Sequence, residues 1–170
     1  MKKITILFIA VSISLFSCSS EDSSPVTSGN ILGTWTGNSI DYSGTTITNF
    51  QGQTIETDYV GESYDMDYTL TFNEDPNVLI SEGNYSLKLT STILGQTTVQ
   101  NVENIEFLEA GTWSLKGDVL TTSAGGKSYE YSIIELTEST LKISVSTEED
   151  LSQQGATITA TVDAVMTFVK

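Results

Sequence analysis

Residues 157–168 read TITATVDAVMTF, a stretch in which apolar and polar side chains alternate from one residue to the next. Alternation with a period of two is typical of a β-strand that buries one face and leaves the other in water. Such strands belong to antiparallel sheets, because strands of parallel sheets are apolar on both faces. The stretch therefore predicts a half-buried antiparallel strand. Its apolar face holds Ile158, Ala160, Val162, Ala164, Met166 and Phe168.

The same alternation recurs earlier in the chain, and turn residues separate the segments that carry it. The apolar faces of these segments are Tyr64–Met66–Tyr68–Leu70–Phe72, Tyr85–Leu87–Leu89, Tyr129–Tyr131–Ile133 and Leu141–Ile143–Val145. Clusters of Gly, Asn, Asp, Ser and Pro predict the turns, at residues 73–77, 82–84, 116–118 and 136–139. Short turns between consecutive strands predict an up-and-down meander. We expect no helix beyond at most one turn near residues 148–154.

A meander of eight to ten strands removes its exposed edges by closing into a barrel. The alternative is a β-sandwich, which usually needs longer crossovers between its sheets. Two long polar segments, residues 44–61 and 92–109, interrupt the pattern. We interpret them as extended hairpins with tips near residues 50–53 and 94–96. Hairpins of this kind at one end of a barrel are candidates for a lid or a partner-binding surface.

The N-terminus has the composition of a secretory signal. Two lysines precede an apolar run at residues 4–16, which is too short to span a bilayer as a helix. The run ends in LFSC, residues 15–18, which resembles the lipobox of bacterial lipoproteins. This resemblance implies that residues 1–17 are a signal peptide and that Cys18 is acylated after cleavage. The expected result is a lipid anchor in the membrane.

Residues 18–28 are small and polar, with two acids close behind Cys18, and we interpret them as a flexible tether. Serine followed by acids at this place resembles the surface-export signal of Bacteroidota lipoproteins. That resemblance implies attachment to the bacterial outer membrane, facing either the periplasm or the cell surface. The alternative is a plain solvated linker facing the periplasm. Residues 29–170 remain as a single barrel domain.

The composition excludes several classes of function. The chain has 22 acidic residues, 7 lysines, no arginine, no histidine, one cysteine and a formal charge of −15. Nucleic acid is excluded as a partner, because phosphate binding needs a basic surface. Catalytic triads and Cys/His metal sites lack their essential residues. The acids lie on wet strand faces or loop tips, so we expect no catalysis, no metal site and no cofactor.

A Gly-x-Trp motif opens the domain at Gly33-Thr34-Trp35, and residues 111–120 form a second motif, GTWSLKGDVL. With the lipobox, these motifs resemble the lipocalin-like lipoproteins of Bacteroidota. The resemblance implies a lipocalin-like barrel whose closed end is plugged by Trp35, with Gly33 as part of the plug. In lipocalins an arginine covers this tryptophan, and this chain has none. We therefore expect the burial of Trp35 to rest on aliphatic and aromatic neighbours.

Two functions fit the predicted barrel. The first is binding of a small apolar or aromatic ligand inside it. The second is a non-catalytic interaction module of a cell-surface complex, with a filled barrel and its long hairpins presented to another protein. A cavity of about 300 Å³ or more would favour the first. The candidate ligand-lining residues are Tyr64, Met66, Tyr68, Phe72, Tyr85, Trp113, Tyr129, Tyr131, Met166 and Phe168.

Overall fold

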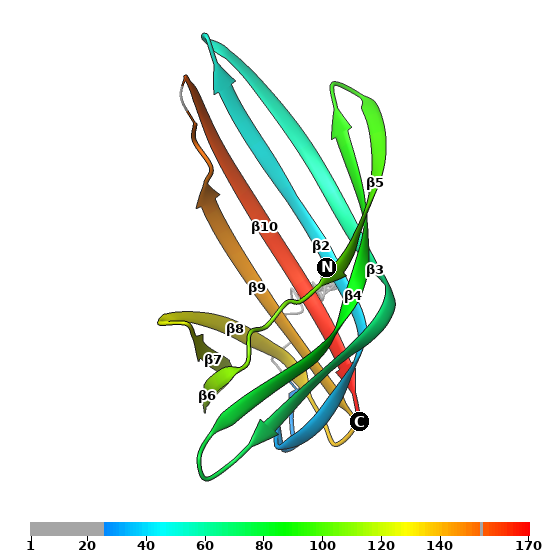
Figure 1. Cartoon of the computed structure of the whole chain (residues 1–170), viewed down its shortest axis with the longest axis vertical. Coiled ribbons are helices and arrows are strands. Elements are labelled where there is room, and N and C mark those ends of the chain that lie inside the picture. Colours follow the sequence, from blue (N-terminus) through cyan, green and yellow to red (C-terminus); the bar gives the residue numbers. More distant parts are fainter. Residues whose placement is uncertain (1–25, 154) are drawn as a thin grey trace, which may run out of the picture.

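The computed structural model describes residues 26–153 and 155–170, and in this part the chain forms ten strands and no helix (Figure 1). The predicted signal peptide, Cys18 and most of the tether lie outside the described residues. In the described part, no helix is long and apolar enough to cross a membrane. The strands are β1 (Val26–Thr27), β2 (Gly33–Phe50), β3 (Gln53–Asn73), β4 (Val78–Ile93), β5 (Gln96–Ile105), β6 (Gly111–Lys116), β7 (Val119–Ala124), β8 (Lys127–Leu136), β9 (Thr140–Asp150) and β10 (Ala156–Val169).

All ten strands belong to one sheet that closes into a ring. The sheet runs β8-β7-β6-β4-β3-β2-β10-β9, and β9 pairs back onto β8. The first long strand, β2, pairs with the last, β10, from Thr36 opposite Val169 to Phe50 opposite Ala156. Every pairing between these strands is antiparallel, and the two-residue strand β1 lies parallel to β8. The predicted all-β meander closing into a barrel is confirmed.

The alternation of β10 determines which of its side chains face the interior. Ala160, Ala164, Met166 and Phe168 are buried, whereas Thr161 between them is exposed. The same rule holds on β9, where Leu141 and Ile143 are buried. Because side chains of a strand alternate between faces, the interior position of one residue fixes that of every second residue along the strand.

Most of the predicted turns lie where the sequence places them. Residues 73–77, 116–118 and 136–139 connect β3 to β4, β6 to β7 and β8 to β9. The tips of the long hairpins also agree, with turns at Gln51-Gly52 and Leu94-Gly95.

The turn predicted at residues 82–84 is wrong, because these residues continue inside β4. Gly83 has a φ of +82°, and a Cβ built on it would lie 1.8 Å from the carbonyl oxygen of Asp67 on β3. The ladder between β3 and β4 shifts register between Tyr64 and Asp67. The glycine therefore serves a β-bulge, where two strands approach closely, and not a turn.

The same bulge corrects the prediction that Tyr64 shares a face with Tyr68 and Phe72. An extra residue in one strand shifts the alternation, so residues on either side of the bulge change face. On the Asp67 side of the bulge, Phe72 pairs with the buried Leu79. On the Tyr64 side of the bulge, the residue that pairs with the buried Leu87 is Ser63 and not Tyr64. Tyr64 consequently lies on the outer face of the barrel.

Trp35, the third residue of β2, is fully buried. β2 begins and β10 ends at the lower end of the barrel (Figure 1). Its indole Nε1 donates a hydrogen bond of 2.7 Å to the carbonyl of Ile31. Trp35 belongs to the cluster of aliphatic and aromatic core residues, as expected, but a cation also lies over its ring. The ammonium of Lys170, one residue beyond the end of β10, lies 4.2 Å from the centre of the ring. A lysine at the C-terminus thus covers the indole.

The upper end of the barrel is less closed, because the strands there do not all pair into the ring. One edge of β4 pairs with β6 at Val78 and Leu79 only, and with β5 farther along, from Tyr85 to Ile93. On the other side, β8 and β9 pair only as far as Ser132 opposite Ser144. The hairpins β2–β3 and β4–β5 extend past this level (Figure 1). The interior therefore opens toward the upper end.

Candidate functional site

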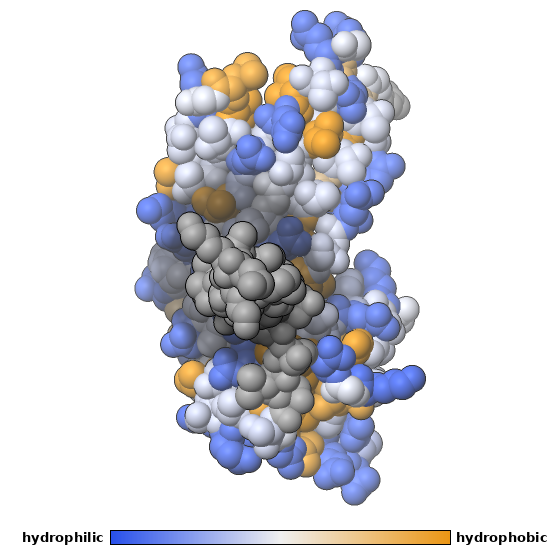
Figure 2. Space-filling view, turned by 180° about the vertical axis from the view of Figure 1, so that it is seen from behind, coloured by the Kyte–Doolittle hydropathy of each residue, from blue (hydrophilic) through white to orange (hydrophobic). Residues whose placement is uncertain are grey.

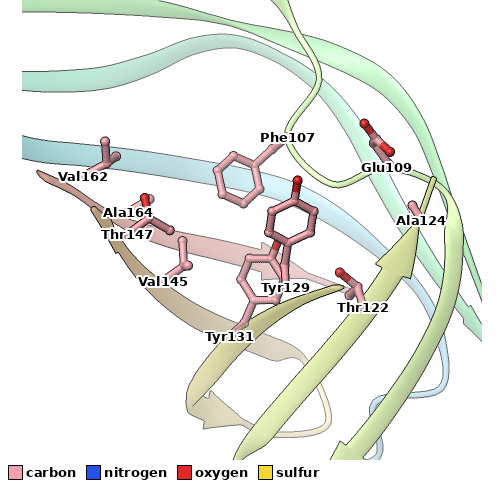
Figure 3. Close-up of a pocket in the computed structure, with 10 residues that line it drawn as sticks. All are labelled: Phe107, Glu109, Thr122, Ala124, Tyr129, Tyr131, Val145, Thr147, Val162 and Ala164. Atoms are coloured by element: carbon pink, nitrogen blue, oxygen red, sulfur yellow. The ribbon is translucent and has the colours of Figure 1, made fainter. Parts of the chain in front are cut away.

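A cavity of about 220 Å³ lies inside the barrel at the level where the ring opens (Figure 3). Side chains of β7, β8, β9, β10 and the β5–β6 connection line it. On β10, Val162 and Ala164 continue the interior row that ends in Phe168, so the cavity lies on the same side of the sheet as the core. Its lining residues are Phe107, Glu109, Thr122, Ala124, Tyr129, Tyr131, Val145, Thr147, Val162 and Ala164.

The connection between β5 and β6 carries Phe107 and Glu109 to the cavity. Between them, Leu108 is 2% exposed and packs into the core. Its backbone N–H donates to the hydroxyl of Tyr68 at 2.9 Å, and that hydroxyl donates back to the Leu108 carbonyl at 3.2 Å. Ser81 donates a third hydrogen bond, of 2.8 Å, to the same hydroxyl. Tyr68 therefore holds the connection in place from within the core.

Aromatic side chains form one side of the cavity and continue into the core below it. The ring of Phe107 lies 6.2 Å from that of Tyr131 and 6.1 Å from that of Tyr42, both centre to centre. The Tyr42 and Tyr85 hydroxyls are hydrogen-bonded to each other. Contacts of this kind fix the rings in defined orientations. The aromatic side of the cavity is therefore preformed.

Burial raises the pKa of one phenol that lines the cavity and of two phenols that lie beneath it. Burial raises the pKa of Tyr42, and its hydrogen bond to Tyr85 raises it further. Burial also raises the pKa of Tyr85 to about 12, although its hydrogen bond to Tyr42 acts in the opposite direction. At Tyr131 burial again raises the pKa, and a hydrogen bond with Thr122 opposes the shift. A charged group in a site of low polarity is costly, so these phenols stay protonated to a higher pH than an exposed tyrosine does.

The chemistry of the lining suits binding more than catalysis. Four aliphatic residues and three aromatic residues supply most of the wall, and Glu109 is the one charged residue among the ten. A general acid–base mechanism of the glycosidase type needs two carboxyl groups within about 5 to 10 Å. Such a lining can hold an apolar or aromatic molecule against its rings.

The size of the cavity limits what fits. It does not reach the roughly 300 Å³ that would favour a ligand-binding barrel over an interaction module, so its volume alone does not decide between the two. It is larger than the apolar cavities of about 150 Å³ that take up benzene. A molecule of one ring with a few substituents fits such a space.

A second hollow of about 630 Å³ adjoins the cavity where β8 and β9 separate, and we call it the side slot. Tyr131, Val145 and Ala164 line both the cavity and the side slot. A longer ligand could therefore extend from the cavity toward the outside between β8 and β9. The other residues of the side slot are Val119, Glu130, Ser132, Ile134, Ser144, Ser146, Asp163 and Val165.

The candidate ligand-lining residues from the sequence lie in different parts of the molecule. Tyr129 and Tyr131 line the cavity. Five others are at most 1% exposed and fill the core beneath it. These five are Tyr68, Phe72, Tyr85, Met166 and Phe168.

The remaining three candidates lie away from the cavity. Met66 is half-buried, with its sulfur packed close over Gly37. Trp113 packs edge-on against Phe72, 5.5 Å between ring centres, and its Nε1 donates to the carbonyl of Asn73. Tyr64 lines a shallow hollow on the outer face.

Sequence reasoning missed eight of the ten lining residues. Val145, Val162 and Ala164 belong to the apolar faces of alternating strands, and alternation alone does not distinguish a cavity wall from packed core. Phe107 and Glu109 lie in the segment 92–109, which was interpreted as a hairpin. One signal in the sequence indicates that this connection turns inward. Phe107 and Leu108 are adjacent apolar residues that interrupt a polar stretch just before Gly111.

One comparison with known proteins identifies a relationship. A family model described as "Lipocalin-like domain" matches residues 31–143, which is more than half of the chain. The matched part begins just before β2 and ends within β9. No curated protein and no solved structure matches the chain.

Proposed function

The chain belongs to the lipocalin-like domain family, and we propose that it binds a small apolar or aromatic molecule in the cavity of its barrel. Members of the family are generally binding proteins and not enzymes. The observation that carries the proposal is the cavity itself. It is an interior space of about 220 Å³, with Phe107, Tyr129 and Tyr131 on one side and aliphatic residues on the other (Figure 3).

The contacts around the cavity support binding without a large rearrangement. Tyr131 is 5% exposed, and Phe107 is held between it and Tyr42. A preformed site loses little conformational freedom when the ligand enters, so more of the contact energy remains as affinity.

Filling the cavity tests the proposal. Val162→Trp places an indole in the cavity from β10, and Ala124→Trp does so from β7. The probe is the neutral one-ring dye 4-(dimethylamino)benzonitrile, whose fluorescence changes in apolar surroundings. Each variant should bind the dye at least about tenfold more weakly than the unmodified domain, a loss of about 1.4 kcal/mol.

The matched control is Thr157→Trp, which adds the same indole on the exposed face of β10. It should bind the dye as the unmodified domain does. If the folded Val162→Trp and Ala124→Trp variants both keep full affinity, the ligand does not enter the cavity and the proposal is wrong.

A second candidate function is a non-catalytic interaction module of a cell-surface complex. The long hairpins support it, because each ends in an exposed apolar residue. Phe50 at the β2–β3 tip is 47% exposed and Leu94 at the β4–β5 tip is 89% exposed. Hydrophobic residues are visible at the upper end of the molecule in Figure 2. Phe50→Ser with Leu94→Ser would abolish partner binding under this function and leave dye binding intact.

We also propose that the domain is a lipoprotein of the bacterial outer membrane, held by an acyl group on Cys18 after removal of residues 1–17. The support is the order of features in the sequence: two lysines, an apolar run and the lipobox-like LFSC. Several acyl chains bind a bilayer strongly enough for a stable anchor. The high negative charge would keep the tethered domain away from an anionic membrane surface.

A further inference from the structure

The charged residues that line the cavity and the side slot are all acidic. Glu109 is the charged residue of the cavity, and Glu130 and Asp163 are those of the side slot. Lys127 on β8 pairs across the hairpin with the lining residue Ala124, but its own side chain is exposed and lines neither hollow. A ligand that reaches the cavity through either opening therefore passes carboxylates and no cationic lining residue.

The position of Glu109 sets where a positive charge would sit. Its side chain lies at the edge of the group of residues in Figure 3, near Ala124. A Cβ built on Gly125 would be 3.7 Å from its carboxylate oxygen Oε2, so the carboxylate lies beside the β7–β8 turn. Phe107, two residues earlier on the same connection, presents its ring to the cavity. A carboxylate and an aromatic wall thus lie on adjacent parts of one site.

The aromatic rings add to the same preference. The face of a phenol or benzene ring carries negative electrostatic potential and attracts a cation held against it. Tyr131 is a neutral phenol at ordinary pH, and burial raises its pKa, which extends the neutral form to more alkaline pH. A quaternary or primary ammonium group beside Phe107, Tyr129 and Glu109 would gain both cation–π attraction and charge pairing. An anionic ligand would meet repulsion at each opening.

We infer that the cavity selects ligands that join a small apolar or single-ring body to an ammonium group, with Glu109 as the residue that recognises the charge. This inference rests on the proposed function, because it names the chemical class of ligand for the same cavity. The ring occupies the aliphatic and aromatic interior, and the ammonium lies at the rim near the β7–β8 turn. The cavity volume of about 220 Å³ accommodates a body of this size.

Three probes of matching size test the inference, because they have the same number of non-hydrogen atoms. They are phenyltrimethylammonium, tert-butylbenzene and benzenesulfonate, which are cationic, neutral and anionic. The affinity of each probe is measured by its displacement of the neutral dye from the protein. Phenyltrimethylammonium should bind about tenfold more tightly than tert-butylbenzene, a difference of about 1.4 kcal/mol. Benzenesulfonate should bind more weakly than both.

Two variants separate the local carboxylate from the general negative field of the protein. Glu109→Gln should weaken phenyltrimethylammonium about five- to tenfold and leave tert-butylbenzene unchanged. Glu106→Gln removes the same charge from the same connection at an exposed residue outside the cavity lining. It should change the affinity for either probe less than twofold. The Glu106 carboxylate lies outside the cavity lining, so it makes no direct pair with a cation held there.

Different failures overturn different statements. If tert-butylbenzene displaces the dye and phenyltrimethylammonium binds no more tightly, the inference is wrong and the proposed function stands. If Glu106→Gln and Glu109→Gln weaken the cation equally, the overall field selects the charge and the role of Glu109 is wrong. If neither the dye nor any of the three probes binds, the proposed function fails and the inference with it.

Discussion

The ammonium group of Lys170 lies 4.2 Å from the centre of the Trp35 indole ring, which is fully buried. The same ammonium donates hydrogen bonds of 3.2 and 2.8 Å to the carbonyls of Asn30 and Leu32. The last residue of the chain is thereby fastened to the segment that leads into the first long strand. This contact joins the two ends of the domain where β2 and β10 pair.

Replacing Lys170 with methionine keeps the aliphatic cover over Trp35 and removes the charge. The cation–π contact and the hydrogen bonds to the backbone are then lost. Because Lys170 is exposed, we expect the free energy of unfolding to fall by about 1 kcal/mol. Denaturant unfolding followed by tryptophan fluorescence measures it. The control is Lys116→Met at the β6–β7 turn, which should have little effect. Equal losses in both variants would contradict a specific role for Lys170.

Trp35→Ala should lower the free energy of unfolding by about 3 to 5 kcal/mol, because it leaves a large cavity in the closed end of the barrel. The substitution also removes the hydrogen bond from Nε1 to Ile31. Dye affinity per folded molecule should stay nearly the same, since Trp35 does not line the cavity. A variant that folds as stably as the original and no longer binds dye would place Trp35 in the binding site instead.

Local patterns in the sequence were sufficient to predict the class of fold. The alternation in residues 157–168 predicts both the strand and its buried face, and Ala164, Met166 and Phe168 are buried as expected. Turn residues at 73–77 and 116–118 mark real strand ends. These features depend on a few neighbouring residues, so the sequence alone contains them.

The errors concern features that depend on residues far apart in the chain. The bulge lies in β3 between Tyr64 and Asp67, close to Gly83 of β4, and an apolar alternation that runs unbroken through residues 64–72 gives no sign of it. Lys170 covers Trp35 only because the last strand pairs with the first. The cavity requires the connection after β5 to cross the barrel, which Tyr68 fixes through Leu108.

Gly83→Ala tests the bulge. A Cβ at this position would collide with the carbonyl oxygen of Asp67, and the φ of +82° adds backbone strain. Gly52→Ala is the matched control, because its φ is +78° and a Cβ there would meet nothing within 4 Å. We expect Gly52→Ala to cost about 1 kcal/mol and Gly83→Ala about 1 to 3 kcal/mol more. Thermal or denaturant unfolding measures both. Similar costs for the two variants would mean that the bulge relaxes freely.

Cys18→Ala tests the proposed anchor in cells of the species that makes the protein. Acylation needs the thiol of Cys18, so the variant should appear as an unprocessed or soluble form. Membrane fractionation with mass spectrometry of the N-terminus distinguishes these forms from an acylated protein in the outer membrane. Ser19→Ala is a suitable control, because it leaves the thiol in place. A Cys18→Ala protein that remains in the outer membrane would rule out the lipoprotein proposal.

Alkaline pH should destabilise the domain through the hydrogen-bonded phenols Tyr42 and Tyr85. Burial raises the pKa of both, that of Tyr85 to about 12, from an ordinary value of 10.0. The folded state therefore binds more protons than the unfolded state above about pH 10, and the free energy of unfolding falls as pH rises. Their contribution is complete below pH 10 and falls above it, through about pH 12 for Tyr85 and further for Tyr42, with a slope of up to about 1.4 kcal/mol per pH unit for each phenol. Denaturant unfolding between pH 8 and 12 measures this slope.

In Tyr42→Phe with Tyr85→Phe both hydroxyls are removed together, which leaves no unpaired partner. This double variant should lose stability less steeply above pH 10, whereas an unchanged slope would mean that other groups cause the alkaline transition.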